Sequence, residues 1–512
     1  GELEHTLKQF EQAENLGSLI QPSISNPKYF KEELEKRGIP QELFLHKTHQ
    51  KVLEILDYSE YLQPRYHVVV ANPPYMGSSN MNSGLKDYVE TFYPFSKYDL
   101  YSVFIERNMG LCIQNSFIGM ITMQTWMFLP SFKKIRKKII RNNHIVTMAH
   151  LGTRAFDTIS GEIVSTTAFV LGRHQDDKYQ GIYIRLVEGQ SELEKKKTLL
   201  RSIADEKRLG KKLTFRVTPE ELRNIPDSRV VYWMEKPIIK TFAKSKIIIK
   251  DLTVSDGQTK TGNNRKYLRS IWEVNKRDIG PNKKWCIHPK GGSFRKWFGN
   301  ISWVIDWSDE ARKHYRTDRV ARILPEYLWD KPGVSWSLIT SDNIAFRVLN
   351  REHIFNLAAP SLFFQNEENI IPCLGLLNSS YSKSILRSIN PSKINIGEVQ
   401  SIPFSSDILK KIDTINTIVK KCIAISKQDW DSKETSINFD LPNILQNNRS
   451  NKGKISTAYK DTRDYWARKS GELKKLEEKN NQLFIDIYDV HGVLEPDVSL
   501  EEITLVNNPF YR

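Results

Sequence analysis

Apolar runs alternate with amphipathic segments in the first third of the chain, and this pattern predicts strands that alternate with helices. Short apolar runs at 67–71, 117–123 and 144–152 have the length and composition of buried strands. Between them, the segment FKKIRKKIIRNN (132–143) places Phe132, Ile135 and Ile139 on one helical face and lysines on the other. We expect an outer helix covering a sheet, although a DNA-contacting helix would have the same pattern.

The segment AFDTISGEIVSTTAFVLGR (155–173) predicts two further strands around a glycine-containing turn. Strands that alternate with helices and then end in a hairpin are typical of an α/β sheet with an antiparallel edge. The next segment, 176–230, is polar and rich in lysine and glutamate. We expect it to be a helical linker. Residues 1–60 are predicted to form a helical connector before the first strand.

A change of composition near residue 231 predicts a second domain. Eight of the eleven tryptophans lie between Trp233 and Trp336, interleaved with lysine, arginine, glycine and asparagine. From residue 405 the pattern becomes helical again, with apolar positions that approximate a heptad repeat near the C-terminal end. We therefore expect a mixed α+β domain at 231–404, followed by a helical C-terminal region at 405–512.

The chain carries a formal charge of +16 and has a pI near 9.3. Such a basic excess favours a polyanionic partner, most often nucleic acid, although a solvated lysine-rich surface has the same composition. Its four cysteines lie far apart without a CxxC pair, so the sequence predicts neither a zinc site nor a disulfide framework. We expect a cytoplasmic protein that binds no metal and no membrane.

The segment YHVVVANPPY (66–75) places Asn72, Pro73, Pro74 and Tyr75 directly after a predicted strand. In open α/β sheets, ligands bind outside the carboxyl ends of the strands. The prolines fix the backbone, so that the Asn72 side chain and the Pro73 carbonyl become fixed acceptors for an exocyclic amine, beside the flat face of Tyr75. Such hydrogen bonds would stabilise charge that develops on the amine nitrogen as it attacks a methyl group. A plain strand-to-turn exit is the structural alternative.

This NPPY motif resembles the catalytic motif of amino-methyltransferases that use S-adenosylmethionine, and its asparagine resembles the adenine-N6 branch. Together with SKYDLYSVFIERNMGL, GMITMQTWMFLPSFKKIRKKI and MAHLGTRAFDTISGEIVSTTAFVL, it closely resembles the PglX methyltransferases of BREX phage-defence systems. The resemblance covers most of 60–512. It implies catalytic roles for Asn72, Pro73, Pro74 and Tyr75, and it places Asp99 and Tyr101 in a block that lines the pocket near cofactor and target base.

One element of the resemblance is missing from the sequence. The glycine-rich cofactor signature of the family lies upstream of NPPY, and no such run occurs here. We therefore expect a fragment that lacks the N-terminal cofactor-binding half. Residues 61–175 would be the C-terminal half of the catalytic domain, a partial Rossmann-like methyltransferase sheet, and 231–404 would be the target recognition domain.

Two glycine-bearing loops of 231–404, DGQTKTGNNRKYLRSIWEV and HPKGGSFRKWFGN, resemble family blocks and suit contacts with DNA. For any single residue, a structural turn with solvated charges is the alternative. The expected contacts to phosphate or base edges involve Lys260, Thr261, Asn263, Asn264, Arg265, Lys290, Arg295 and Lys296, and a later segment adds Ser392 and Lys393.

The function expected from the resemblance is S-adenosylmethionine-dependent adenine-N6 methylation of double-stranded DNA in phage defence. Other BREX proteins and acidic DNA-mimic phage proteins are the further candidate partners. The alternatives are a non-catalytic DNA-binding fragment and a methyltransferase that acts on RNA or on protein glutamine.

Overall fold

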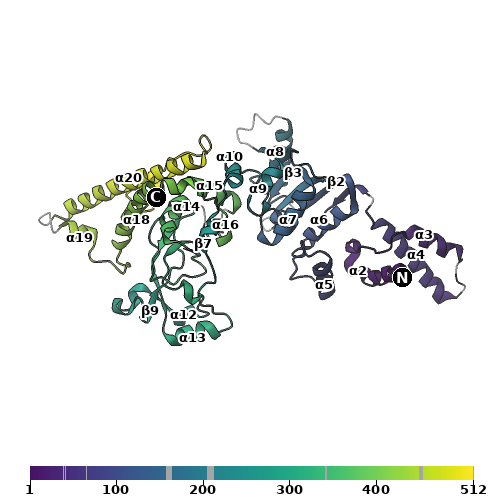
Figure 1. Cartoon of the computed structure of the whole chain (residues 1–512), viewed down its shortest axis with the longest axis horizontal. Helices are drawn as coiled ribbons and strands as arrows, with labels where there is room; N and C mark the ends of the chain where they lie inside the picture. The colour runs from purple at the N-terminus through teal and green to yellow at the C-terminus, as the bar shows by residue number, and fades with distance from the viewer. Residues whose placement is uncertain are drawn as a thin grey trace. The chain divides into compact units, whose positions relative to one another are not determined.

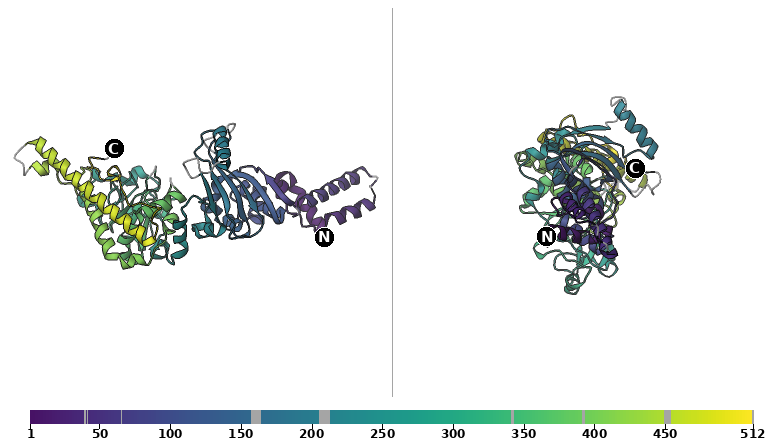
Figure 2. Two further views of the ribbon diagram at one scale, coloured as in Figure 1. Left: turned by 90° about the horizontal axis from the view of Figure 1, so that it is seen from above. Right: turned by 90° about the vertical axis from the view of Figure 1, so that its right-hand side faces the viewer.

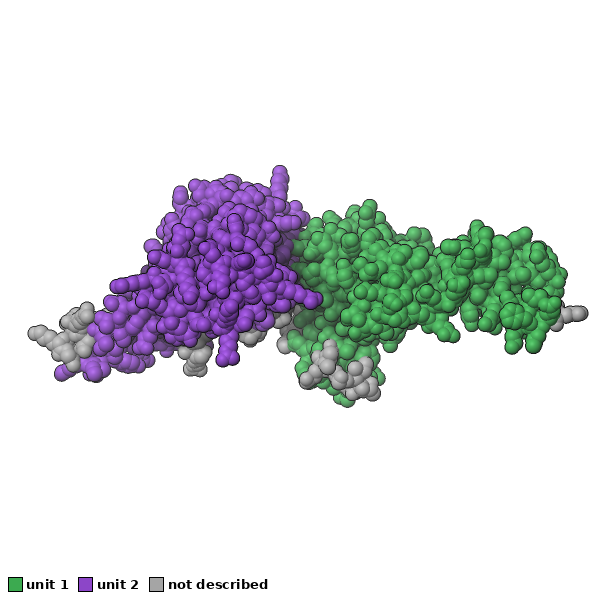
Figure 3. Space-filling view, turned by 90° about the horizontal axis from the view of Figure 1, so that it is seen from below, with its two compact units in different colours: residues 1–233 green, residues 234–512 purple. Residues whose placement is uncertain are grey.

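The computed structural model describes residues 1–38, 40, 42–64, 66–156, 164–204, 213–340, 343–390, 393–448 and 454–510. The chain divides into two compact units, residues 1–233 and 234–512, which are coloured separately in Figure 3. Each unit is described by itself.

The first unit contains a six-stranded mixed sheet and the helices around it (Figures 1 and 2). Its strands are β1 (Tyr66–Ala71), β2 (Cys112–Met123), β3 (His144–Gly152), β4 (Thr166–Gly172), β5 (Gly181–Arg185) and β6 (Thr214–Val217). Its α-helices are α1 (Glu2–Gln9), α2 (Ala13–Leu16), α3 (Pro27–Lys36), α4 (Leu43–Tyr61), α5 (Ser83–Phe92), α6 (Leu100–Leu111), α7 (Lys133–Asn142), α8 (Glu192–Ala204) and α9 (Pro219–Asn224). The predicted α/β class is confirmed at this level.

The sheet order is β1-β2-β4-β3-β5-β6. The pairs β1–β2 and β3–β5 are parallel, whereas β2–β4, β4–β3 and β5–β6 are antiparallel. Strands β1, β2 and β3 therefore run in the same direction. Their carboxyl ends lie along one edge of the sheet and their amino ends along the opposite edge.

Helices α6 and α7 cover one face of this sheet. Helix α6 packs on β1 and β2, and α7 packs against β3. An ion pair of 2.7 Å between Lys138 Nζ and Glu106 Oε1 joins the two helices. Phe132, Ile135 and Ile139 are buried, as the sequence pattern of α7 predicts. This packing confirms α7 as a helix that covers the sheet.

The opposite face remains partly open near β1, which forms one edge of the sheet. Val68 and Val70 are 59% and 78% exposed, and Phe117, the register partner of Val68 on β2, is 48% exposed. Large apolar side chains in adjacent positions at a sheet edge are typical of a surface that another segment covers.

The segment 176–230, expected to be a helical linker, instead completes the sheet. Strand β5 pairs with β3 and β6 pairs with β5, while only α8 and α9 fit the helical expectation. The strands IYIR and TFRV are short, and their pairing with β3 decides their conformation more than the polar sequence around them does. The first strand predicted within 155–173 falls largely on 157–163, outside the described residues.

His150 links the sheet to the end of the first unit. Its Nε2 lies 2.6 Å from Gln124 Oε1 and its Nδ1 lies 2.9 Å from the Tyr232 hydroxyl. The ring also stacks on Trp233. Burial, together with the charges of Arg185 and Lys195, lowers the pKa of His150 to about 3.

The lowered pKa of His150 makes the free energy of unfolding depend on pH. Its pKa in the folded state lies below the unfolded value of about 6.5, so unfolding takes up a proton between roughly pH 6.5 and pH 3. The contribution of His150 is therefore fully present above that window and declines by about 1.4 kcal/mol per pH unit as the pH falls through it.

Denaturant unfolding at several pH values, followed by a signal from the first unit, measures the slope of its free energy of unfolding against pH. We expect His150→Gln to flatten it, and the exposed His5→Gln to leave it unchanged. An unchanged slope in His150→Gln would exclude this residue as the source.

The second unit combines two small antiparallel sheets with a helical region. Its strands order as β8-β10-β9 and β12-β11-β13-β7. These are β7 (Thr253–Val254), β8 (Leu268–Ser270), β9 (Trp285–Ile287), β10 (Trp303–Asp306), β11 (Gly333–Trp336), β12 (Phe346–Leu349) and β13 (Ser361–Phe364). The shorter helices among them are α10 (Lys236–Lys244), α11 (Ile249–Leu252), α12 (Asn264–Tyr267) and α13 (Asp309–Thr317).

The helical region packs on these sheets within the same unit. It comprises α14 (Ile370–Leu377), α15 (Ser380–Ile389), α16 (Ile396–Gln400), α17 (Asp407–Lys410), α18 (Ile412–Asp431), α19 (Asn443–Asn448) and α20 (Ile455–Tyr488). Helix α18 packs against both α14 and α20, and Figure 2 shows α20 in yellow along this unit. The described helices contain no segment that is long and apolar enough to cross a membrane.

Candidate active site and nucleic-acid interface

The NPPY segment begins directly after β1, at the carboxyl edge of the sheet. Asn72 and Pro74 are exposed, Pro73 is buried and Tyr75 is half-buried. Burial raises the pKa of the Tyr75 hydroxyl, so this ring stays neutral at ordinary pH. The Asn72 amide is therefore exposed beside a buried proline at the end of the strand.

Asp99 fastens the loop that follows NPPY. Its Oδ1 accepts hydrogen bonds from the backbone N–H of Met76 at 3.1 Å and of Tyr101 at 3.3 Å. Backbone bonds from Ser78 N to Tyr98 O (3.0 Å) and from Leu100 N to Met76 O (2.9 Å) complete the connection. Burial raises the pKa of the Asp99 carboxyl, and these N–H donors partly offset that effect. Asp99 thus caps α6 and holds the loop in place.

Tyr101 lies beneath the motif in an aromatic cluster. It is fully buried, and its ring meets Tyr75 edge-on, with the centroids 6.0 Å apart. On its other side it contacts Phe132, and its hydroxyl lies 2.8 Å from Thr125 Oγ1. Both Asp99 and Tyr101, expected beside the cofactor, therefore make internal contacts that support Tyr75 and the loop.

Thr125 and Gln124 were not singled out from the sequence, although their position offers a signal. They follow β2 directly, just as Asn72 follows β1. Because β1 and β2 are parallel, Asn72, Gln124 and Thr125 all lie at the carboxyl ends of the strands. Polar residues just after two parallel strands are a recognisable feature of a site at a sheet edge.

The NPPY loop presents an exposed amide and an aromatic ring at the carboxyl end of β1. Asn72 and the Pro73 carbonyl fit the exocyclic amine of a planar base, and Tyr75 offers its ring. Asp99 Oδ1 accepts from two backbone donors, which ties this carboxyl to the loop. Among the described residues, no group of three His, Cys, Asp or Glu side chains is placed to hold a metal ion.

The predicted DNA contacts of the second unit separate into exposed and buried residues. Lys260 and Asn263 are exposed on the loop that leads into α12, and Thr261 on that loop is buried. Asn264 and Arg265 are exposed in the first turn of α12. Asn263 Oδ1 caps α12 by accepting from Lys266 N at 3.1 Å. Thr261 donates to Asn264 Oδ1 at 2.6 Å. These bonds hold the loop of Lys260 against the helix of Arg265, and both side chains are exposed.

The remaining residues of the expected set differ in their surroundings. Lys290 is half-buried with its ammonium 4.8 Å from the centroid of the Trp303 ring, and burial lowers the pKa of this lysine. Lys393 is exposed, next to Ile339, which is 75% exposed. Ser392 lies outside the described residues.

Arg295 and Lys296 are not available as phosphate contacts in this structure. Arg295 is 3% exposed and pairs with Asp429 at 2.7 Å, and Lys296 is 7% exposed and pairs with Glu477 at 2.6 Å. The carboxylate of Glu477 also accepts from Trp297 Nε1 at 2.7 Å. The expectation of two surface cations was wrong here because their acidic partners lie far along the chain, on α18 and α20.

Comparisons with known proteins find relatives along the chain. Residues 4–156 match the family described as Eco57I restriction-modification methylase. The chain is 31% identical to the adenine-specific methyltransferase PglX of Lacticaseibacillus casei (strain Zhang), over 99% of this chain and 43% of that protein. It is 28% identical to the adenine-specific methyltransferase BrxX of Escherichia coli O9:H4 (strain HS), over 100% of this chain and 41% of that protein.

These relatives confirm the resemblance to PglX-type adenine-specific methyltransferases that the motifs indicate, and the chain is homologous to them along its whole length. It spans less than half the length of either relative. Among solved structures, the Type IIL restriction-modification enzyme MmeI in complex with DNA matches with a TM-score of 0.49 and 13% identity, over 84% of this chain and 55% of that one.

Proposed function

We propose that this chain supplies the catalytic loop and the DNA-recognition unit of an enzyme that methylates adenine N6 in double-stranded DNA. The observation that carries the proposal is the NPPY segment at the carboxyl end of β1, with Asn72 exposed and the following loop fastened by Asp99. Homology to adenine-specific methyltransferases supports the choice of adenine over other amine substrates.

The residues of the loop act on the target amine in this proposal. The Asn72 side-chain oxygen and the Pro73 carbonyl accept its two N–H bonds, which localises the nitrogen lone pair for attack. These acceptors gain strength as positive charge develops on nitrogen, so they stabilise the transition state more than the ground state. Tyr75 stacks on the base once it has left the helix. Its edge contact with Tyr101 keeps the ring in one orientation.

The cofactor of the proposed reaction is S-adenosylmethionine, which supplies an electrophilic methyl group when bound. We propose that its main binding elements lie on a segment outside this chain, which covers the face of Val68, Val70 and Phe117 and pairs along β1 to complete a Rossmann-like sheet. The exposure of these apolar side chains at an edge strand supports this placement. We keep Asp99 and Tyr101 as proposed lining of the pocket on the cofactor side, where they also hold Tyr75 and the loop.

The second unit is the proposed DNA reader. Lys260, on the loop before α12, and Arg265, within α12, supply phosphate or base contacts. Asn263 and Asn264 shape the turn between them, and Lys290 and Lys393 are further candidates. The formal charge of +16 supports a polyanionic partner. By the resemblance to PglX proteins, we also propose a role in BREX phage defence, with other BREX proteins and acidic DNA-mimic phage proteins as partners. A mimic that fails to compete with duplex DNA would contradict the last of these.

Salt-dependent binding of duplex DNA tests the proposed interface. We expect Lys260→Ala to weaken binding and to reduce the slope of log K against log salt by about 1, because one phosphate contact is lost. The control Lys410→Ala removes an exposed lysine that pairs with Asp407 on α17, and it should change neither quantity. Equal slopes for Lys260→Ala and the unmodified protein would remove this loop from the interface.

A further inference from the structure

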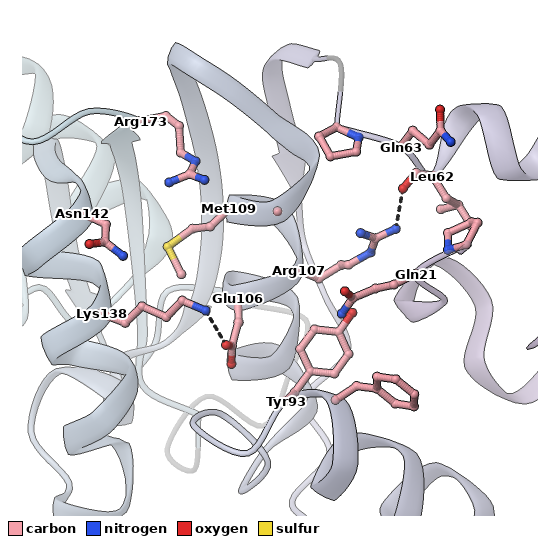
Figure 4. A pocket seen from close by; sticks show the side chains of 14 residues that line it. Gln21, Leu62, Gln63, Tyr93, Glu106, Arg107, Met109, Lys138, Asn142 and Arg173 are labelled. Atoms are coloured by element: carbon pink, nitrogen blue, oxygen red, sulfur yellow. Dashed lines mark hydrogen bonds and ion pairs between the residues drawn. The ribbon is translucent and has the colours of Figure 1, made fainter. Parts of the chain in front are cut away.

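The first unit contains a pocket of about 440 Å³ (Figure 4). It lies at the amino ends of β1, β2 and β3, whereas NPPY follows the carboxyl end of β1. Pro64, Gly110 and Asn142 line it just before β1, β2 and β3 begin, and Arg173 lines it just after β4 ends. One strand length of six residues, about 20 Å, separates this edge from Asn72. The pocket is therefore distinct from the proposed methylation site, and nothing in that proposal uses it.

Positive charge dominates the lining of this pocket. Arg107 is 5% exposed and donates to the backbone carbonyls of Ser18, Ile20 and Leu62 at 2.7–2.8 Å, so its charge is held by neutral acceptors. Among the described residues of the lining, Glu106 is the only carboxylate, and it pairs with Lys138. These described residues carry a net charge of +2, from Arg107, Lys138 and Arg173 against Glu106.

Arg173 has a buried donor without a partner among the described residues. Its Nε is buried and has no hydrogen-bond acceptor among the described residues. Figure 4 shows its guanidinium directed into the pocket, on the side of Asn142 and Met109. A buried donor of a charged group is costly when it has no acceptor, so the site favours a ligand that supplies one. The planar arginine fork suits the paired oxygens of a phosphate.

The rest of the lining suits a larger ligand than a free phosphate. The volume lies within the usual range for small-molecule sites, roughly 300–1,000 Å³. Phe92 is 47% exposed at the pocket and offers an aromatic surface. Gln21, Gln63 and Asn142 add amide groups. We propose that this pocket binds a nucleotide, with its phosphate on Arg173 and its base against Phe92.

Calorimetric titration of the protein with AMP, adenosine and inorganic phosphate tests the proposal directly. We expect AMP to bind with one site per chain and adenosine to bind much more weakly, because it lacks the anion. Arg173→Gln should weaken AMP binding about tenfold to a hundredfold, the value of one charge-assisted hydrogen bond. Arg216→Gln, which removes an exposed arginine on β6, should leave the affinity unchanged.

A second variant keeps the test decisive if Arg173→Gln does not fold. Gly110 lines the pocket, and a Cβ there would meet no atom within 4 Å among the described residues, so Gly110→Leu adds bulk at the lining. It should abolish AMP binding while its thermal unfolding stays normal. The proposal is overturned if AMP does not bind, if AMP and adenosine bind equally, if phosphate binds and AMP does not, or if Gly110→Leu binds AMP normally.

Discussion

Replacing Asn72 with alanine is expected to lower the rate of methyl transfer about 100- to 1,000-fold, the usual cost of removing one preorganised hydrogen-bond partner of a transition state. The side chain is exposed beyond the end of β1, so its loss removes an acceptor without opening a cavity. We expect duplex-DNA affinity to remain unchanged. Transfer of labelled methyl groups to duplex DNA, by a preparation that contains the cofactor-binding elements, measures the rate.

Asn72→Asp is the matched variant for this prediction, because it keeps the side-chain oxygen while altering its charge. It should retain more activity than Asn72→Ala if the oxygen acts as an acceptor. Equal rates for Asn72→Ala and the unmodified protein would contradict the role of NPPY. Loss of DNA affinity in Asn72→Ala would instead assign this residue to binding.

Removing the Asp429 carboxylate is expected to destabilise the second unit by about 3–5 kcal/mol, because Asp429→Ala leaves a buried guanidinium without its charge partner. Asp429 is 0% exposed and accepts from Arg295 Nη2 at 2.7 Å, Val506 N at 2.8 Å and Asn507 N at 2.9 Å. Denaturant unfolding followed by tryptophan fluorescence measures the change, since most tryptophans lie in this unit.

Glu326→Ala is the control for this prediction. Glu326 pairs with Arg316 at the surface, with side-chain exposures of 70% and 46%, so its removal should cost about 0–1 kcal/mol. A similar small cost for Asp429→Ala would show that the buried pair does not hold α18 to the loop of Arg295.

The sequence was most informative where a local pattern decides the structure. The apolar runs at 67–71 and 144–152 form β1 and β3, and the amphipathic segment after Phe132 forms α7 with the predicted face buried. NPPY follows a strand as expected, because four apolar residues and two prolines determine a strand and its exit within ten residues. The α/β class follows from the same runs.

The sequence was least informative where residues far apart in the chain determine strand pairing or burial. Strands β5 and β6 form by pairing with β3 and with each other, which polar local sequence did not reveal. From the sequence alone, Arg295 and Lys296 resemble surface cations. In the structure they are buried in ion pairs with Asp429 of α18 and Glu477 of α20. The pocket around Arg173 is likewise built from segments between residues 21 and 173, and no short motif marks it.

The most direct measurement of the central claim is nucleoside analysis by mass spectrometry of duplex DNA incubated with S-adenosylmethionine and a methylation-competent preparation of this protein. We expect N6-methyladenine, and far less of it after the same incubation time when Asn72 is replaced by alanine. Methylated cytosine in the DNA would contradict it, and so would methyl transfer to RNA or to protein glutamine with unmodified DNA.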